Sequence, residues 1–132
     1  MENNLQISLQ GHLGVITLDR ASHLNALSLS MIHGISQQLE QWREDDRVQA
    51  VLINSNSPKA FCAGGDIRFL YDSYQNGAAN YQRYFADEYH MLKSLRQYAK
   101  PVVVFLDGYV LGGGFGLAQA CQIIVSSEKS RF

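Results

Sequence analysis

The sequence predicts a single α/β domain in which short β-strands alternate with helices. Short runs rich in valine, isoleucine and leucine, typical of buried strands, alternate with two long segments whose apolar residues recur at helical spacing. Glycine-rich turns follow two of these strands, at Gly64-Gly65 and at Gly112-Gly113-Gly114. A chain of 132 residues with 46% hydrophobic content can bury one core, so one domain is expected over residues 1–132.

The N-terminal part predicts a β-hairpin followed by a long helix. Residues 5–9 and 13–18 alternate apolar and polar side chains around a glycine-containing turn, the second run less regularly. A polar loop over residues 19–25 leads to Ser28, a suitable N-cap for a helix that ends near Asp45. The apolar residues on one face of this helix are Met31, Ile32, Ile35, Leu39 and Trp42. Such a stripe is typical of a face that packs on the core.

The middle of the chain predicts a buried strand, the first glycine turn and a short helix. Residues 49–54 contain the run Ala-Val-Leu-Ile, and residues 55–58 break the strand before the turn. Asp66 is placed to cap a short helix over residues 67–74. Residues 75–80 predict a loop.

The helix expected over residues 80–98 carries an acid within its apolar face. The apolar residues of this face are Tyr81, Tyr84, Phe85, Met91, Leu92 and Leu95. Glu88 lies one turn from apolar residues on either side, and a buried carboxylate is costly unless it is paired or hydrogen-bonded. One interpretation is a buried ion pair with Arg68 or Arg20. The other is a carboxylate that contacts a ligand and has a perturbed pKa.

The C-terminal third predicts a buried strand over residues 101–106, the second glycine turn, and a helix over residues 115–120. Amides at a helix start lack intrahelical partners, and glycines without Cβ atoms let an electron-rich oxygen approach them. Taken alone, this turn is equally consistent with tight packing of a helix on a sheet. Two such turns, each after a strand, favour a site in which each turn directs one amide at a single carbonyl oxygen, as in acyl-transfer and enolate chemistry.

The chain resembles the crotonase superfamily of acyl-CoA enzymes over nearly its whole length. The matching segments are Leu18-Asp19-Arg20, Leu24-Asn25-Ala26-Leu27, Ala60-Phe61-Cys62-Ala63-Gly64-Gly65-Asp66-Ile67-Arg68, Lys100-Pro101 and Gly108-Tyr109-Val110-Leu111-Gly112-Gly113-Gly114-Phe115-Gly116-Leu117. Within the superfamily it most resembles the 3-hydroxyisobutyryl-CoA hydrolase group. The resemblance implies the N-terminal portion of the crotonase-type (ClpP/crotonase-like) spiral core. It also implies hydrolysis of an acyl-CoA thioester, a reaction of valine degradation.

The resemblance assigns roles to residues of this chain. It implies that the backbone amides of Ala63 and Gly113 stabilise the oxyanion. Glu88 is expected to orient the substrate hydroxyl or a catalytic water. The residues expected to admit or bind the substrate are Gly64, Gly65, Asp66, Gly112, Gly114, Asn25, Ala26 and Leu27. No metal and no separate cofactor are implied, since CoA is part of the substrate.

Two departures from the family pattern define the alternatives. The hydratases of the superfamily carry a glutamate at the position of Gly116, so an enoyl-CoA hydratase or isomerase is a weaker alternative. The sequence ends before the Pro-Glu segment that carries a catalytic carboxylate in the family. We therefore expect either a fragment that binds acyl-CoA without turnover, or one half of an assembly with a companion chain.

Composition limits the classes of partner and the cellular location that the sequence predicts. With 11 basic and 12 acidic residues, the chain lacks the basic surplus of nucleic-acid-binding proteins. It has no apolar run of membrane-spanning length and no N-terminal signal pattern. Cys62 and Cys121 form no CxxC pair, and a reducing cytoplasmic location is expected. The four histidines show no metal-ligand spacing, and a homo-oligomer is left open.

Overall fold

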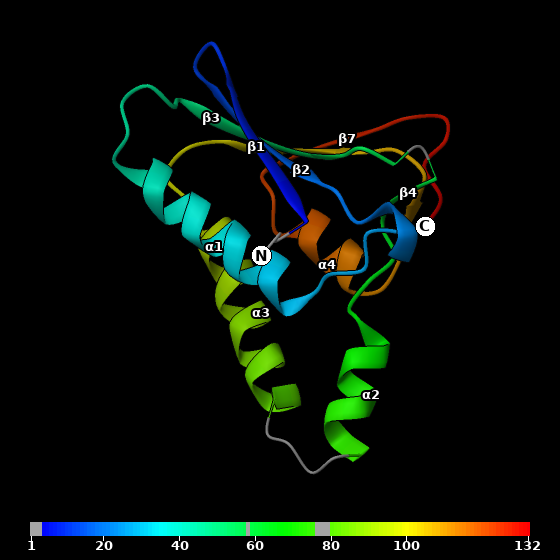
Figure 1. Ribbon diagram of the computed structural model, residues 1–132. Coiled ribbons are helices and arrows are strands. Elements are labelled where there is room, and N and C mark those ends of the chain that lie inside the picture. The colour runs from blue at the N-terminus through cyan, green and yellow to red at the C-terminus, as the bar shows by residue number, and fades with distance from the viewer. Residues whose placement is uncertain (1–3, 58, 76–79) are drawn as a thin grey trace.

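A five-stranded sheet forms one layer of the computed structural model, which describes residues 4–57, 59–75 and 80–132 (Figure 1). Its strands are β1 (Leu5–Gln10), β2 (Leu13–Leu18), β3 (Ala50–Ser55), β5 (Val102–Leu106) and β7 (Ile123–Ser126). They lie in the order β1-β2-β3-β5-β7. The hairpin strands β1 and β2 are antiparallel, and every later neighbour is parallel. The predicted alternation of strands and helices is confirmed.

A second, two-stranded sheet determines where the glycine turns lie. It pairs β4 (Ala60–Cys62) with β6 (Tyr109–Val110) in parallel. Two backbone hydrogen bonds continue this pairing on either side: Tyr109 N donates to Lys59 O over 3.0 Å, and Leu111 N donates to Cys62 O over 3.1 Å. Because each strand ends just before a glycine turn, parallel pairing brings the two turns to the same edge.

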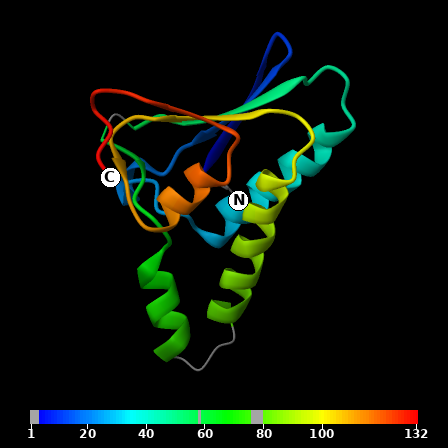
Figure 2. The same cartoon turned by 180° about the vertical axis from the view of Figure 1, so that it is seen from behind.

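The helices lie together on one side of the large sheet, and the view from behind shows the same arrangement (Figure 2). They are α1 (Leu29–Arg43), α2 (Ile67–Gln75), α3 (Asn80–Arg96) and α4 (Gly113–Gln119), with a short 3-10 helix at Ala21–His23. Ser28 Oγ accepts a hydrogen bond from Met31 N over 3.2 Å, which confirms the predicted N-cap. Asp66 Oδ1 likewise accepts from Phe69 N over 3.1 Å and caps α2.

The core lies between the sheet and the helices. The predicted face of α1 is buried, as are the alternate residues of β3 and β5 that point toward the helices. Trp42 packs so closely on β2 that a Cβ on Gly14 would lie 2.6 Å from its ring. Side chains of this size contribute about 1.5–3 kcal/mol each on burial. The core therefore fixes α1 and α3 against the sheet that carries the site.

Boundaries differ modestly from the predictions. Helix α1 ends at Arg43 and α3 at Arg96, each two residues early, while α4 begins two residues early at Gly113. Residues 76–79 of the predicted 75–80 loop lie outside the described residues. The structure adds β4, β6 and β7, which the sequence did not predict. Within the described residues, no helix combines the length and apolarity needed to span a membrane.

Candidate active site

The two glycine turns meet at the edge of the small sheet. A Cβ on Gly64 would lie 3.5 Å from Gly113 N, and a Cβ on Gly113 would lie 3.3 Å from Gly65 N. The turns thus approach each other through main-chain atoms, without intervening side chains. The sequence predicted that the two glycine turns contribute to one site, and the structure brings the two turns into contact.

The amide of Gly65 replaces the predicted amide of Ala63 as a candidate oxyanion donor. Ala63 N donates a hydrogen bond to Leu24 O over 3.0 Å, so this amide already has an acceptor in the loop over residues 19–27, called the first loop here. Gly65 N and Gly113 N donate no hydrogen bond to any acceptor in the described part of the chain. The change of direction occurs at Gly64, whose φ of 114° favours glycine.

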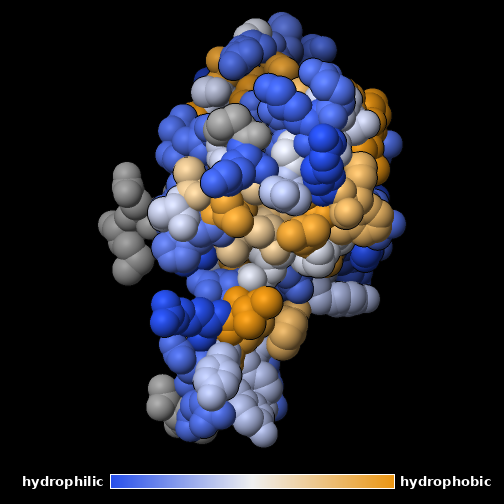
Figure 3. Space-filling model, turned by 90° about the vertical axis from the view of Figure 1, so that its right-hand side faces the viewer, coloured by the Kyte–Doolittle hydropathy of each residue, from blue (hydrophilic) through white to orange (hydrophobic). Residues whose placement is uncertain are grey.

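A cavity of about 270 Å³, called the turn cavity here, opens in front of these amides. Its lining consists of Ala63, Gly64, Gly65, Ile67, Leu70, Tyr84, Phe85, Glu88, Gly112 and Gly113. The lining joins both turns to the first residues of α2 and the middle of α3. Figure 3 shows the face that carries α2, where hydrophobic residues gather in a band across the middle and at the top of the α2 projection. A mainly apolar cavity with few polar groups is typical of a small-molecule site.

Among the described residues of that lining, Glu88 is the only acidic one. Its Oε2 atom would lie 3.3 Å from a Cβ on Gly113. Desolvation by the half-buried surroundings raises the pKa of the Glu88 carboxyl. Neither suggested ion pair occurs among the described residues, because Arg20 instead pairs with Asp66 over 2.9 Å and Arg68 is exposed without an ion pair. The carboxyl group therefore remains available to a ligand.

Tyr84 is a residue of this site that sequence reasoning missed. Its hydroxyl donates to Leu27 O over 2.6 Å and accepts from Asp66 N over 3.3 Å. Burial raises the pKa of this hydroxyl, which keeps it a neutral donor. In the sequence Tyr84 is one of several apolar-stripe residues, and only its spacing of four residues from Glu88 pointed to the same helix face.

The first loop supports the turn and contributes no side chain to the turn cavity. Asn25 is fully buried, where its Oδ1 accepts from Arg20 N over 2.7 Å and its Nδ2 donates to Ala60 O over 3.2 Å. Arg20 Nη1 donates to Ala26 O over 2.9 Å, and Leu27 is also fully buried. The predicted substrate-binding residues Asn25, Ala26, Leu27 and Asp66 therefore lie behind the site, where they hold the backbone of the turn.

The remaining glycines of the second turn have separate environments. Gly112 lines the turn cavity, whereas a Cβ on Gly114 would lie 2.3 Å from Cys62 O. Gly114 is thus required for packing of α4 on β4 and does not face the cavity. Apart from its own helix backbone and chain neighbours, no atom of the described residues would lie within 4 Å of a Cβ on Gly116. Burial raises the pKa of the Cys62 thiol to about 12, which argues against a nucleophilic thiolate beside the turns.

A second cavity adjoins the first. It has a volume of about 320 Å³ and is lined by Val110, Leu111, Gly112, Phe115 and Phe132, so that Gly112 borders both cavities. Phe115 and Phe132 meet edge to face with their ring centroids 5.9 Å apart.

Among the described residues, no three His, Cys, Asp or Glu side chains cluster as metal ligands.

Comparison with known proteins identifies a family and several relatives that the chain resembles. A sequence model described as "Enoyl-CoA hydratase/isomerase" matches residues 13–132. The mitochondrial 3-hydroxyisobutyryl-CoA hydrolase of Danio rerio is 42% identical over 122 residues, which cover 92% of this chain and 32% of that protein. Its Homo sapiens counterpart is 38% identical over 123 residues, covering 93% and 32%. The chain thus spans about a third of the length of the curated relatives it matches.

Solved structures agree with this grouping. An enoyl-CoA hydratase from Rhodobacter sphaeroides superposes with a TM-score of 0.92 at 34% identity, covering 96% of this chain and 38% of that one. A carnitinyl-CoA dehydratase from Mycobacterium thermoresistibile gives a TM-score of 0.94 at 31% identity, covering 98% and 38%. The crotonase-type fold expected from sequence is confirmed. This chain belongs to the enoyl-CoA hydratase/isomerase family.

Proposed function

We propose that the chain provides the oxyanion-binding part of an acyl-CoA thioester hydrolase that acts on a short, branched hydroxyacyl-CoA such as 3-hydroxyisobutyryl-CoA. Water adds to the thioester carbonyl, the carbon–sulfur bond breaks, and the products are the free acid and the CoA thiol. The amides of Gly65 and Gly113 would stabilise the negative charge that develops on the carbonyl oxygen. Because the chain spans about a third of the matched hydrolases, the complete reaction is proposed for it together with a companion polypeptide.

One observation carries the proposal: two adjacent main-chain amides, from Gly65 and Gly113, face one cavity with no acceptor among the described residues. Fixed donors of this kind act without reorganising when charge develops. Side chains are absent from both donor positions, so a carbonyl oxygen can approach them closely.

Glu88 is proposed to bind the hydroxyl group of the substrate or the attacking water. Its carboxyl group lies beside Gly113 and has no hydrogen-bond partner in the described part of the chain. The desolvation that raises the pKa of the Glu88 carboxyl also favours its hydrogen bonding to a bound polar group. The family resemblance supports the same role at this position.

Hydration or isomerisation of an enoyl-CoA is the second candidate activity, and the names of the solved relatives favour it. The hydratases that the sequence resembles use a glutamate at the position of Gly116, where this chain has no side chain. That difference favours hydrolysis over hydration. Binding of acyl-CoA without turnover remains the expectation if Glu88 is the only acid that reaches the substrate.

The test begins with the intact mass, under denaturing conditions, of every polypeptide in the purified sample. The same sample is then given 3-hydroxyisobutyryl-CoA, with release of the CoA thiol measured, and crotonyl-CoA, with loss of the conjugated double bond measured. Thiol release supports the hydrolase, and double-bond consumption supports the hydratase instead. If neither reaction occurs and calorimetric titration detects no acyl-CoA binding, the proposal is wrong.

A further inference from the structure

The hydroxyl of Tyr84 connects three segments around Gly65. It donates to Leu27 O over 2.6 Å and accepts from Asp66 N over 3.3 Å. It would also lie 3.0 Å from a Cβ on Gly65. The hydroxyl thus touches the residue that offers the candidate donor, the residue that follows it, and the loop behind it.

The same segments are joined by a short backbone ladder. Leu27 N donates to Gly64 O over 2.7 Å, and Asp66 N donates to Leu27 O over 3.1 Å. These bonds hold Gly65 between them with its N–H pointing away from Leu27, toward the turn cavity. Since Leu27 O accepts from both Asp66 N and the Tyr84 hydroxyl, loss of the hydroxyl removes one side of this support.

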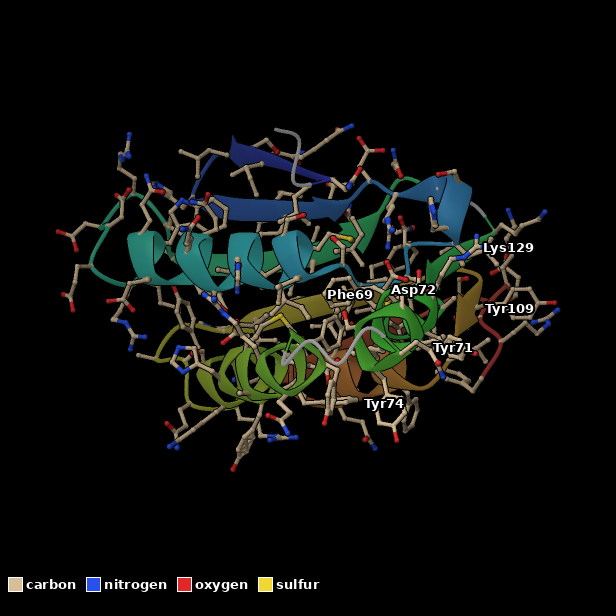
Figure 4. All side chains as sticks on the ribbon, turned by 60° about the horizontal axis from the view of Figure 1, so that its bottom comes forward. Phe69, Tyr71, Asp72, Tyr74, Tyr109 and Lys129 are labelled. Atoms are coloured by element: carbon tan, nitrogen blue, oxygen red, sulfur yellow. The ribbon has the colours of Figure 1, made fainter. Side chains whose placement is uncertain are left out.

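The Tyr84 ring is itself fixed. Phe69 lies on the inner side of α2 (Figure 4), with its ring centroid 6.0 Å from that of Tyr84, while Tyr71 of the same helix is exposed. Phe85, the next residue of α3, packs edge to face on Tyr84 with the ring centroids 5.8 Å apart. The Tyr84 ring is buried on α3 and packs against Phe69 of α2, so its hydroxyl is held beside the turn.

We propose that Tyr84 is a positioning residue for catalysis: its hydroxyl fixes the direction of the Gly65 amide and so determines how strongly a bound acyl carbonyl is polarised. This inference rests on the proposed function of the Gly65 and Gly113 amides. Tyr84 acts through Gly65, since its hydroxyl is occupied by main-chain partners and needs no contact with the reacting atoms.

Tyr98 provides a matched control within the same chain. Its hydroxyl is also buried and also donates to a main-chain carbonyl, Leu39 O, over 2.6 Å. That bond joins the segment after α3 to α1, and neither Tyr98 nor Leu39 lines the turn cavity. Tyr84→Phe and Tyr98→Phe therefore each remove a 2.6 Å hydroxyl-to-carbonyl hydrogen bond, and Tyr84→Phe also removes the acceptor of Asp66 N at the site.

The test measures carbonyl polarisation, which needs no turnover. The probe is a ketone analogue of isobutyryl-CoA in which a methylene group replaces the thioester sulfur, labelled with ¹³C at the carbonyl. Infrared difference spectroscopy compares its carbonyl band free and bound to the purified protein. We expect a downshift on binding to the wild type, the same downshift with Tyr98→Phe, and loss of more than half of it with Tyr84→Phe. An unchanged downshift in Tyr84→Phe would overturn the inference.

The wild-type spectrum separates the two proposals. If the probe binds without a downshift, the Gly65 and Gly113 amides do not polarise a carbonyl. The proposed function is then wrong, and so is the inference that rests on it. A wild-type downshift that Tyr84→Phe and Tyr98→Phe reduce equally assigns Tyr84 a structural role only, against the inference.

A rescue variant covers the case in which Tyr84→Phe does not fold. Replacement of Tyr84 by 4-aminophenylalanine keeps a donor at the position of the hydroxyl, and the wild-type downshift should return. A folded rescue variant with the downshift lost would contradict the inference. Where the sample hydrolyses the thioester, Tyr84→Phe should lower kcat about 10- to 100-fold and leave KM nearly unchanged, because only the transition-state interaction is misdirected.

Discussion

The carboxyl group of Glu88 lies directly against Gly113, since a Cβ on that glycine would be 3.3 Å from Glu88 Oε2. The same hypothetical atom would be 3.3 Å from Gly65 N. Gly113 is thus the point at which the candidate acid and both glycine turns converge. Any side chain there would enter the space between the donors and the carboxyl group.

Gly113→Val should therefore abolish turnover or tight acyl-CoA binding. The added side chain blocks approach to both amides, and loss of even one oxyanion donor costs about 100- to 1,000-fold in kcat where chemistry is rate-limiting. Gly116→Ala is the matched control on the same helix, because its Cβ would meet no atom within 4 Å. Thiol release and calorimetric titration measure the two variants. Wild-type turnover in Gly113→Val would remove Gly113 from the site.

Glu88→Gln should change how stability depends on pH. Burial raises the pKa of Glu88 above its ordinary value of 4.5, so the folded state holds more protons than the unfolded state just above that pH. Stability from this group is complete below pH 4.5 and falls as the pH rises through the raised pKa. The glutamine variant should lose that decline. Urea midpoints between about pH 4 and 8 measure it, with the exposed Glu128→Gln as control; parallel profiles for all three proteins would refute the prediction.

Lys100→Met should destabilise the fold without touching the site. Lys100 Nζ donates to Trp42 O over 2.6 Å and to Asp45 O over 2.8 Å, and so satisfies carbonyl groups at the C-terminal end of α1. Loss of these charge-assisted bonds should lower the free energy of unfolding by about 1.5–3 kcal/mol. Urea unfolding checks this value against Lys93→Met, whose side chain is exposed on α3. Equal losses in the two variants would mean that Lys100 stabilises nothing specific.

Gly114→Ala should destabilise the fold far more than the addition of one methyl group suggests. Its Cβ would lie 2.3 Å from Cys62 O, a main-chain atom of β4 that cannot rotate away. Overpacking of this kind costs about 1–3 kcal/mol and occasionally more, and here α4 must also shift away from β4. The expected result is a large drop in melting temperature by circular dichroism. A melting temperature within the wild-type error would show that α4 can move freely.

The long elements were predictable because their signals are local and repeated. The apolar face of α1 recurs over several turns, and Ser28 and Asp66 cap their helices through bonds to residues three positions ahead. The short strands β4 and β6 carry too few residues for any periodicity. Strand β7 has an apolar run that alone does not distinguish a strand from a continuation of α4.

The site was predictable in its location and less so in its atoms. The two glycine turns and Glu88 line one cavity, the arrangement that the family resemblance implied. The choice between the amides of Ala63 and Gly65 depends on the φ of Gly64 and on the carbonyl of Leu24, a long-range contact. The side chains of Asn25 and Leu27 turned inward for the same reason, since their partners lie in distant segments.

The pairing of β4 with β6 has a consequence for folding. The two candidate donors belong to distant segments of the chain that this small ladder brings together, so neither segment can acquire the site by itself. Loop-closure entropy must be overcome before such distant segments meet, so we expect the site to form late in folding. Ligand binding would then select the fully assembled chain over partly folded intermediates, and acyl-CoA would act as a folding ligand that raises the apparent stability by mass action.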